Sequence, residues 1–115
     1  MTQRGDLVTV ALPGAYGKPR PALVIQSDLL AELESVLVCP ITSDLRDAMF
    51  RVTVEPSLTN GLQKISQVMV DKTAPIPRAK VSEPIGTLDA ERMRAVERAL
   101  PRTRSKPARA SSANA

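Results

Sequence analysis

Short apolar segments separated by proline- and glycine-rich turns constrain the fold of this chain most strongly. The segments are rich in Val, Ile and Leu, and several alternate apolar with polar residues, which is typical of half-buried strands. They predict strands at 7–12, 21–26, 36–42, 50–54 and 65–71, and an extended segment at 74–77 that suits a sheet edge.

Prolines mark where these strands begin and where they are interrupted. Residues 21–26 are apolar almost throughout, so we expect a central strand covered on both faces. Pro40 falls inside the next strand, and proline inside a strand predicts a sheet edge or a bulge. Residues 13–19 hold two prolines and two glycines, which predicts a loop.

A single helix is predicted near the end of the apolar region. Asp89 suits its N-cap, because a carboxylate there can accept from the exposed N–H groups of the first turn. Met93, Val96 and Leu100 then fall on one face, and Pro101 ends the helix. Five or six short strands and one helix predict a mainly β fold, built as a small, strongly bent antiparallel sheet or barrel.

The charge divides the chain into a neutral body and a basic tail. Although Lys and Arg number 16 against 12 Asp and Glu, residues 1–100 carry equal numbers of each. The excess lies in residues 101–115, which have no acid and no apolar periodicity. We therefore expect one domain over residues 1–100 and a disordered basic tail over 101–115. The basic pI alone does not indicate that the body binds nucleic acid.

Composition excludes several kinds of site. No histidine is present, so there is no His general base and no His-ligated metal. The single cysteine, Cys39, rules out an internal disulfide and suits a reducing cytoplasm. Two aromatic residues, Tyr16 and Phe50, are too few for a base-stacking RNA platform. No apolar run approaches the ~20 residues of a membrane span, and no signal-peptide pattern opens the chain; we expect a cytoplasmic protein.

Four landmarks spread over residues 4–100 are similar to those of a known family. They are Arg-Gly-Asp-Leu-Val at 4–8, Arg-Pro-Ala-Leu-Val-Ile at 20–25, Pro-Ile-Thr-Ser at 40–43, and Val-Asp at 70–71 followed by Ile-Gly-Thr-Leu at 85–88. In this order they resemble the MazF/PemK toxins of bacterial toxin–antitoxin pairs. The resemblance implies an SH3-like small barrel, a homodimer, and sequence-specific cleavage of single-stranded RNA without a metal or other cofactor.

The resemblance also implies a catalytic set of Arg20, Thr42 and Asp71. A guanidinium presents a planar fork to phosphate and stabilises developing charge, and a hydroxyl can donate to a phosphate oxygen. Asp71 would act as the base or orient Arg20. The expected products carry a 2′,3′-cyclic phosphate and a 5′-hydroxyl. We expect further RNA contacts from Tyr16, Lys18, Ser43 and Lys72.

Three features depart from the family pattern. The first loop is short, and Tyr16 and Lys18 are its only functional side chains, whereas many members carry Glu or His there. Met69 stands where PemK-type members have arginine, and Lys72 where many members have glutamine. These departures bear on the base and on the cleavage motif.

Each candidate residue also has a purely structural interpretation. Arg20 would then be a solvated residue at a strand start. The hydroxyls of Thr42 and Ser43 would bond to their own backbone. Asp71 would be a turn residue or an ion-pair partner of Arg20.

Three functions agree with these observations. The leading hypothesis is an endoribonuclease toxin inhibited by an antitoxin, whose disordered acidic C-terminal segment would cover the RNA groove. A CcdB-like gyrase poison shares the barrel without being an enzyme, but relies on a Trp-Gly-Ile ending, and this chain has no tryptophan. The third is an inactive relative that only binds RNA or an antitoxin.

Overall fold

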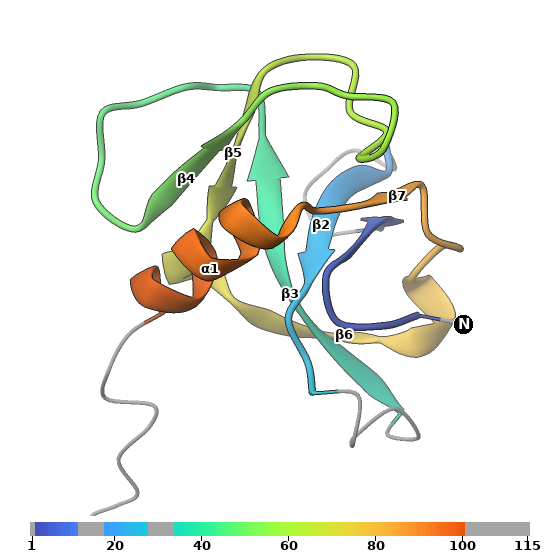
Figure 1. The fold of residues 1–115 in the computed structure, drawn as a ribbon. Helices are drawn as coiled ribbons and strands as arrows, with labels where there is room; N and C mark the ends of the chain where they lie inside the picture. The colour runs from blue at the N-terminus through green and yellow to red at the C-terminus, as the bar shows by residue number, and fades with distance from the viewer. Residues whose placement is uncertain (1, 12–17, 28–33, 101–115) are drawn as a thin grey trace, which may run out of the picture.

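The computed structural model describes residues 2–11, 18–27 and 34–100 (Figure 1). The predicted tail at 101–115 lies outside these ranges, as does most of the loop predicted at 13–19. The elements, in chain order, are β1 (Asp6–Val10), β2 (Arg20–Val24), β3 (Ser35–Thr42), β4 (Arg51–Val54), β5 (Ser66–Met69), the 3₁₀ turn η2 (Val70–Lys72), β6 (Ala74–Pro77), the 3₁₀ turn η3 (Arg78–Lys80), β7 (Gly86–Thr87) and α1 (Ala90–Ala99).

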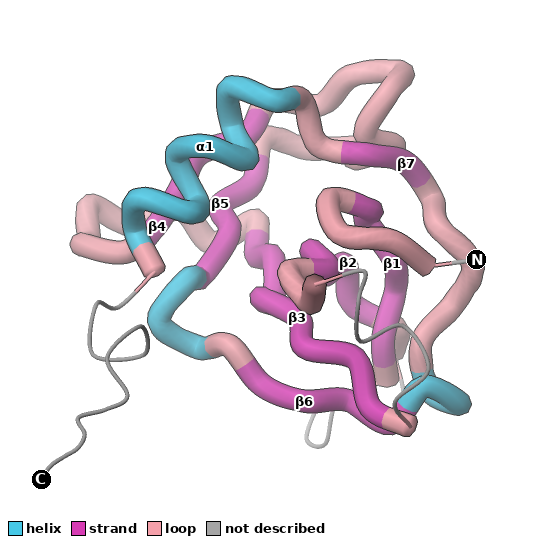
Figure 2. Tube along the Cα trace, turned by 60° about the horizontal axis from the view of Figure 1, so that its bottom comes forward, coloured by secondary structure: helices cyan, strands magenta, loops and turns pink. Residues whose placement is uncertain are grey.

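The strands form one strongly bent antiparallel sheet. Its order is β4-β5-β3-β2-β1-β7, and β6 pairs with β3 beside this path. Figure 2 shows the strands curling around a shared interior, with α1 lying across the open side near β4 and β5. The predicted mainly β fold with a C-terminal helix is therefore confirmed.

β2 is the central strand that the sequence predicts. It pairs with β1 on one side and β3 on the other. Leu23 belongs to one buried cluster, whereas its neighbours Ala22 and Val24 belong to another, because side chains alternate between the two faces of a strand. All three are at most 2% exposed. The sheet therefore buries apolar side chains on both faces of β2.

Pro40 does not lie at a sheet edge, so that one of the two expected positions, edge or bulge, was wrong. β3 is an interior strand, and Pro40 pairs with Ala22 of β2. On the other side of β3, pairing with β6 ends at Val38 and pairing with β5 begins at Ile41. Pro40 thus falls in the break between two ladders, where its missing N–H costs no hydrogen bond.

The helix has the predicted cap and apolar face. The carboxylate of Asp89 accepts a hydrogen bond from the backbone N–H of Arg92 at 3.1 Å. Val96 is fully buried in the core, and Met93 and Leu100 pack against the same cluster. Because α1 is only ten residues long, we attribute its stability mainly to this packing.

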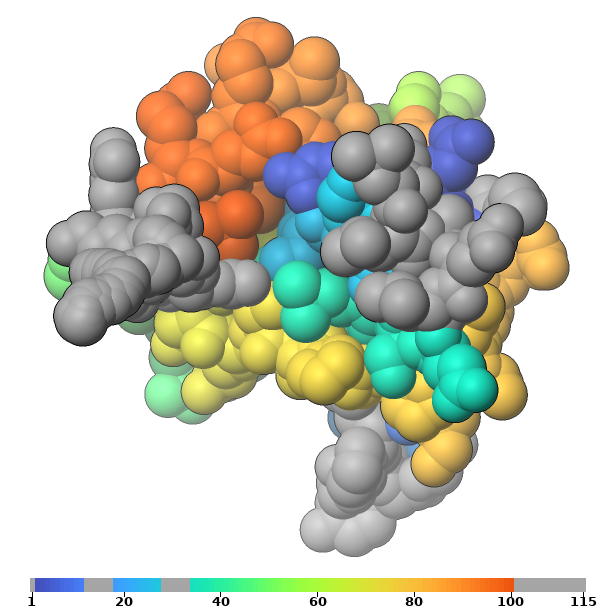
Figure 3. Space-filling view, turned by 90° about the horizontal axis from the view of Figure 1, so that it is seen from below, coloured from blue at the N-terminus to red at the C-terminus, as the bar shows by residue number. Residues whose placement is uncertain are grey.

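The N-terminal segment is tied to α1. Arg4 donates to a carboxylate oxygen of Glu97 at 2.9 Å and also to the carbonyl of Ile25. Figure 3 shows the helix, in orange, beside the first residues, in blue. Both side chains of the ion pair are partly exposed, so we expect it to contribute at most about 1 kcal/mol.

The Asn-Gly turn is organised around one buried amide. Asn60 is only 4% exposed. Its Oδ1 accepts from the backbone N–H groups of Ser57 and Leu62, and its Nδ2 donates to the carbonyl of Glu55. One side chain therefore closes the whole turn.

Two glycines let this turn pack against the segment that contains β7. Gly61 has a φ of +75°, which favours glycine, and a Cβ added to it would lie 2.3 Å from the carbonyl oxygen of Ile85. A Cβ added to Gly86 would lie 2.3 Å from the carbonyl carbon of Asn60. The two backbones therefore meet at a distance that excludes any side chain at either position.

We expect Gly86→Ala to destabilise the fold by several kcal/mol, because its Cβ would have to displace the backbone at Asn60. Urea unfolding measures the effect. The neighbouring Thr87 is exposed, so Thr87→Ala should change stability by no more than about 0.5 kcal/mol. Equal stability of the two variants would contradict the close packing.

Candidate functional site

Two of the three predicted catalytic residues lie at the same end of the β2–β3 pair. β2 begins at Arg20 and β3 ends at Thr42, and the two strands are antiparallel with Ala22 opposite Pro40. Continuing this register by two residues sets Arg20 opposite Thr42. Side chains two residues apart lie on the same face of a strand, so Arg20 and Thr42 lie on the same face as Ala22 and Pro40. The fold thus brings together residues that are 22 positions apart in the chain.

Both side chains are available to a ligand. Arg20 is exposed, and it forms no ion pair within the described part of the chain. Thr42 is half-buried, and its Oγ1 accepts a hydrogen bond from the backbone N–H of Asp44 at 3.0 Å. This bond matches the structural interpretation of Thr42. It also leaves the hydroxyl proton free to be donated to a phosphate oxygen.

Gln67 holds the loop that follows Thr42. It lies opposite Thr42 in the β3–β5 register and is only 8% exposed. Its Oε1 accepts from the backbone N–H of Arg46 and from the guanidinium of Arg51, both at 3.0 Å. Its Nε2 donates to the carbonyl of Arg46 at 3.1 Å and to Oγ1 of Thr53 at 3.3 Å. One buried amide therefore fixes the exit of β3.

The third predicted catalytic residue, Asp71, lies elsewhere. It is exposed in η2, the turn between β5 and β6, and β3 runs between this turn and β2. No ion pair joins Asp71 to Arg20 among the described residues. Lys72 is exposed on the same turn, and Lys18 is exposed just before β2. Tyr16 lies outside the described residues.

A hollow of about 360 Å³ opens at the strand ends that carry Arg20 and Thr42. Its walls come from both neighbours of Arg20, from the residue after Thr42, and from the segments around the Asn-Gly turn and β7. The lining residues are Thr9, Pro19, Pro21, Ser43, Gly61, Leu62, Gln63, Lys64, Ser66 and Ile85. Of the predicted RNA-contacting residues that the structure describes, only Ser43 is among them.

Sequence reasoning missed Gln63 and Lys64. Both are exposed and line this hollow just before β5. Two adjacent polar residues between an Asn-Gly turn and an apolar strand were the signal available. It is a weak signal, because polar residues commonly precede a strand.

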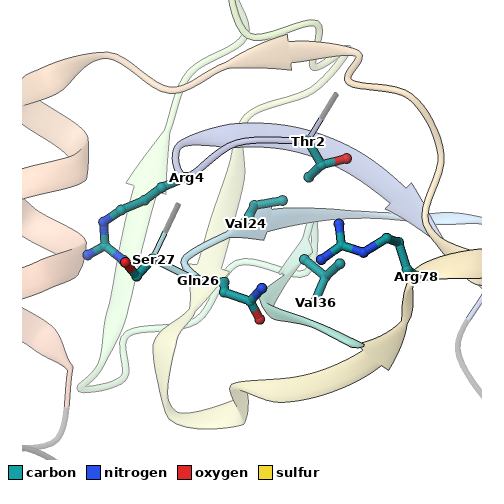
Figure 4. A pocket seen from close by; sticks show the side chains of 7 residues that line it. All are labelled: Thr2, Arg4, Val24, Gln26, Ser27, Val36 and Arg78. Atoms are coloured by element: carbon teal, nitrogen blue, oxygen red, sulfur yellow. The ribbon is translucent and has the colours of Figure 1, made fainter. Parts of the chain in front are cut away.

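A second hollow near the N-terminus is too small to be a site of this kind. It encloses about 10 Å³, which is room for about one water molecule. Arg4 and Arg78 both line it, but Figure 4 shows the Arg4 guanidinium turned away from Arg78. The two charges therefore do not converge on one ligand.

The described residues contain neither a candidate metal cluster nor a candidate membrane-spanning helix. No three His, Cys, Asp or Glu side chains gather in an arrangement that could hold a metal ion there. Likewise, no helix within the described ranges is long and apolar enough to cross a membrane.

Comparison with known proteins decides the family. A family model described as PemK-like, MazF-like toxin of type II toxin–antitoxin system matches residues 3–103. The chain belongs to this family. The "Probable endoribonuclease MazF" of Mycolicibacterium smegmatis is 41% identical over 100 residues, which cover 85% of this chain and 92% of that protein.

Solved structures of MazF proteins share the fold. The Mycobacterium tuberculosis toxin MazF-mt6 is 29% identical, with a TM-score of 0.72 over 83% of this chain and 91% of that one. The MazE-MazF structure (Form-II) from Deinococcus radiodurans is 25% identical, with a TM-score of 0.70 over 86% and 90%. The MazF-like barrel fold expected from the resemblance is therefore confirmed.

In this MazF/PemK chain, we expect Gln67→Leu to free the loop after β3. It removes all four side-chain hydrogen bonds, including the two that hold the backbone N–H and carbonyl of Arg46, at about 0.5–1.5 kcal/mol each. Hydrogen exchange should show faster exchange of the Arg46 amide. Thr53→Val removes only one of the four bonds and should leave that amide protected. Unchanged protection in Gln67→Leu would contradict this role.

Proposed function

We propose that this chain is the toxin of a type II toxin–antitoxin pair and an endoribonuclease that cleaves single-stranded mRNA at a short sequence motif. The identity of 41% with a protein named as a probable MazF endoribonuclease supports the activity. The observation that carries the proposal is the meeting of Arg20 and Thr42 at one end of the β2–β3 pair.

The chemistry follows from what these two groups can do. The 2′-oxygen attacks the phosphorus after losing its proton to a base, and the bond from phosphorus to the 5′-oxygen breaks. The 5′-oxygen takes up a proton from solvent water, so that a 2′,3′-cyclic phosphate and a 5′-hydroxyl result. The charge on the phosphoryl oxygens rises in the transition state. The Arg20 guanidinium stabilises that charge, and the Thr42 hydroxyl donates a hydrogen bond to one of the oxygens.

A base must take the 2′-hydroxyl proton, and Asp71 remains our candidate. Strands are spaced by about 4.8 Å, so β3 keeps η2 roughly 10 Å from β2. RNA that crosses β3 from Arg20 reaches Asp71 and Lys72 next. A general base acts within hydrogen-bond reach of its proton, so this role requires the scissile nucleotide to extend over β3.

We propose that the protein works as a homodimer in the cytoplasm and is inhibited by a cognate antitoxin. The D. radiodurans MazE-MazF structure supports an antitoxin partner. Lys18, Arg20 and Lys72 are exposed cations, and a disordered acidic segment of the antitoxin would be complementary to them.

Cleavage of purified RNA separates this proposal from its rivals. We expect the wild-type protein to cut RNA without ribosomes and to leave 5′-hydroxyl ends. Arg20→Ala should lower the rate about 10²–10³-fold with unchanged thermal stability, because it removes a group that stabilises transition-state charge. Arg98, exposed on α1, provides the matched control, and Arg98→Ala should cut at the wild-type rate.

The outcomes test the parts separately. Binding of RNA without cleavage would favour the inactive relative, and no action on RNA together with gyrase inhibition would favour the gyrase poison. A normal rate in Arg20→Ala would overturn the site assignment. In the same assay, Asp71→Asn should lose at least about 10²-fold if Asp71 is the base; a wild-type rate would remove only that role.

A further inference from the structure

The 360 Å³ hollow lies on the opposite side of the sheet end from the Arg20–Thr42 pair. Pro19 and Pro21 flank Arg20 in the chain, and Ser43 follows Thr42. Pro21 follows Arg20 within β2, and successive side chains of a strand point to opposite faces. Pro21 and its partner Thr9 in β1, which also lines the hollow, therefore face away from the pair. Only the thickness of the sheet, at the ends of β2 and β3, separates the hollow from the catalytic groups. RNA passing around these strand ends would place a phosphate on the face with Arg20 and Thr42 and a neighbouring base on the face with the hollow.

The hollow has the form of a site for a small planar group. Pro21, Leu62 and Ile85 supply apolar walls, and Gln63 and Lys64 supply polar groups. Concave sites with apolar walls and a few placed polar groups are typical of small-molecule binding, and its volume lies in their usual range. A nucleobase presents two apolar faces and a polar edge, which match the apolar walls and the polar groups of the hollow.

The walls are held in place before any ligand arrives. The close contact of Gly61 with Ile85 joins two of the lining segments. The buried Asn60 closes the turn that precedes Leu62, with its Oδ1 accepting from the Leu62 N–H at 2.9 Å. Figure 1 shows this turn, in yellow-green, beside the beginning of β2. A preformed site loses little conformational freedom on binding, which favours selectivity.

We propose that this hollow is a specificity subsite that holds the nucleobase next to the scissile phosphate, and that Gln63 and Lys64 recognise the edge of that base. The inference rests on the proposed endoribonuclease activity. A lysine ammonium only donates hydrogen bonds, whereas a glutamine amide both donates and accepts. The Lys64 ammonium therefore favours a base edge with a carbonyl oxygen, such as that of guanine or uracil, over adenine, whereas the Gln63 amide can pair with either kind of edge.

The same two residues have a simpler alternative role. Lys64 could contact a phosphate and attract RNA of any sequence. A phosphate contact weakens binding uniformly across sequences, whereas a base contact changes the preference at one position. The two roles therefore differ in what a variant does to the cleavage motif.

The test is cleavage of a randomised RNA pool, followed by sequencing of the 5′-hydroxyl ends. Gln63→Ala and Lys64→Ala should still cut, and each should lose about tenfold or more of the preference at one position beside the cleavage site. Gln3→Ala and Lys80→Ala replace exposed residues outside the hollow and should retain the wild-type motif. All four positions are exposed, so we expect all four variants to fold; thermal denaturation checks this.

An unchanged motif in both subsite variants would overturn the proposal, and so would a uniform slowing at every sequence. A parallel arm measures the binding of the four RNA homopolymers by fluorescence anisotropy. If the wild-type protein does not cut, the proposed activity fails, but this arm still tests the subsite. Loss of discrimination against poly(A) in Lys64→Ala would support it, and equal discrimination in all proteins would overturn it.

Discussion

The sharing of β3 among three neighbouring strands is the constraint on which the rest of the structure depends. β3 pairs with β2 on one side and, on the other, first with β6 and then with β5. The sheet must bend where the second neighbour changes, and Pro40 occupies that break. This change of neighbour places the end of β3, with Thr42, beside the beginning of β2, with Arg20.

Two buried amides then fix the loops around that strand end. Gln67 binds both backbone groups of Arg46 and so holds the exit of β3. Asn60 closes the turn that forms a wall of the neighbouring hollow. Buried amides with satisfied hydrogen bonds favour one backbone arrangement over others, because any alternative would leave polar groups unpaired. The loops around the proposed RNA site are thus held in one arrangement by the two amides.

The sequence predicted what depends on local pattern. The apolar segment that forms β2 and the cap of α1 at Asp89 are each encoded within a few residues, and the structure confirms both. The edge position considered for Pro40 was wrong because its environment depends on which strands flank β3, and that is decided by distant residues. The motif match could likewise not show that β3 separates Asp71 from Arg20.

The hollow was beyond sequence reasoning for a similar reason. Thr9, Ser43, Lys64 and Ile85 come from four separate segments, and no local pattern relates them. They meet only because the sheet bends and because two glycines allow close backbone packing. The family motifs therefore pointed to Arg20 and Thr42 as candidate catalytic residues, whereas the folded structure was needed to find the hollow beside them.

The central claim is that Arg20 and Thr42 act on the same phosphate as one unit. A double-mutant cycle tests it most directly, with cleavage rates measured for the wild-type protein, Arg20→Lys, Thr42→Val and the double variant on one RNA. Groups that act together are not additive, so we expect a coupling free energy of about 1 kcal/mol or more, which is at least roughly fivefold in rate. If the two losses simply multiply, the two residues act independently and the account is wrong.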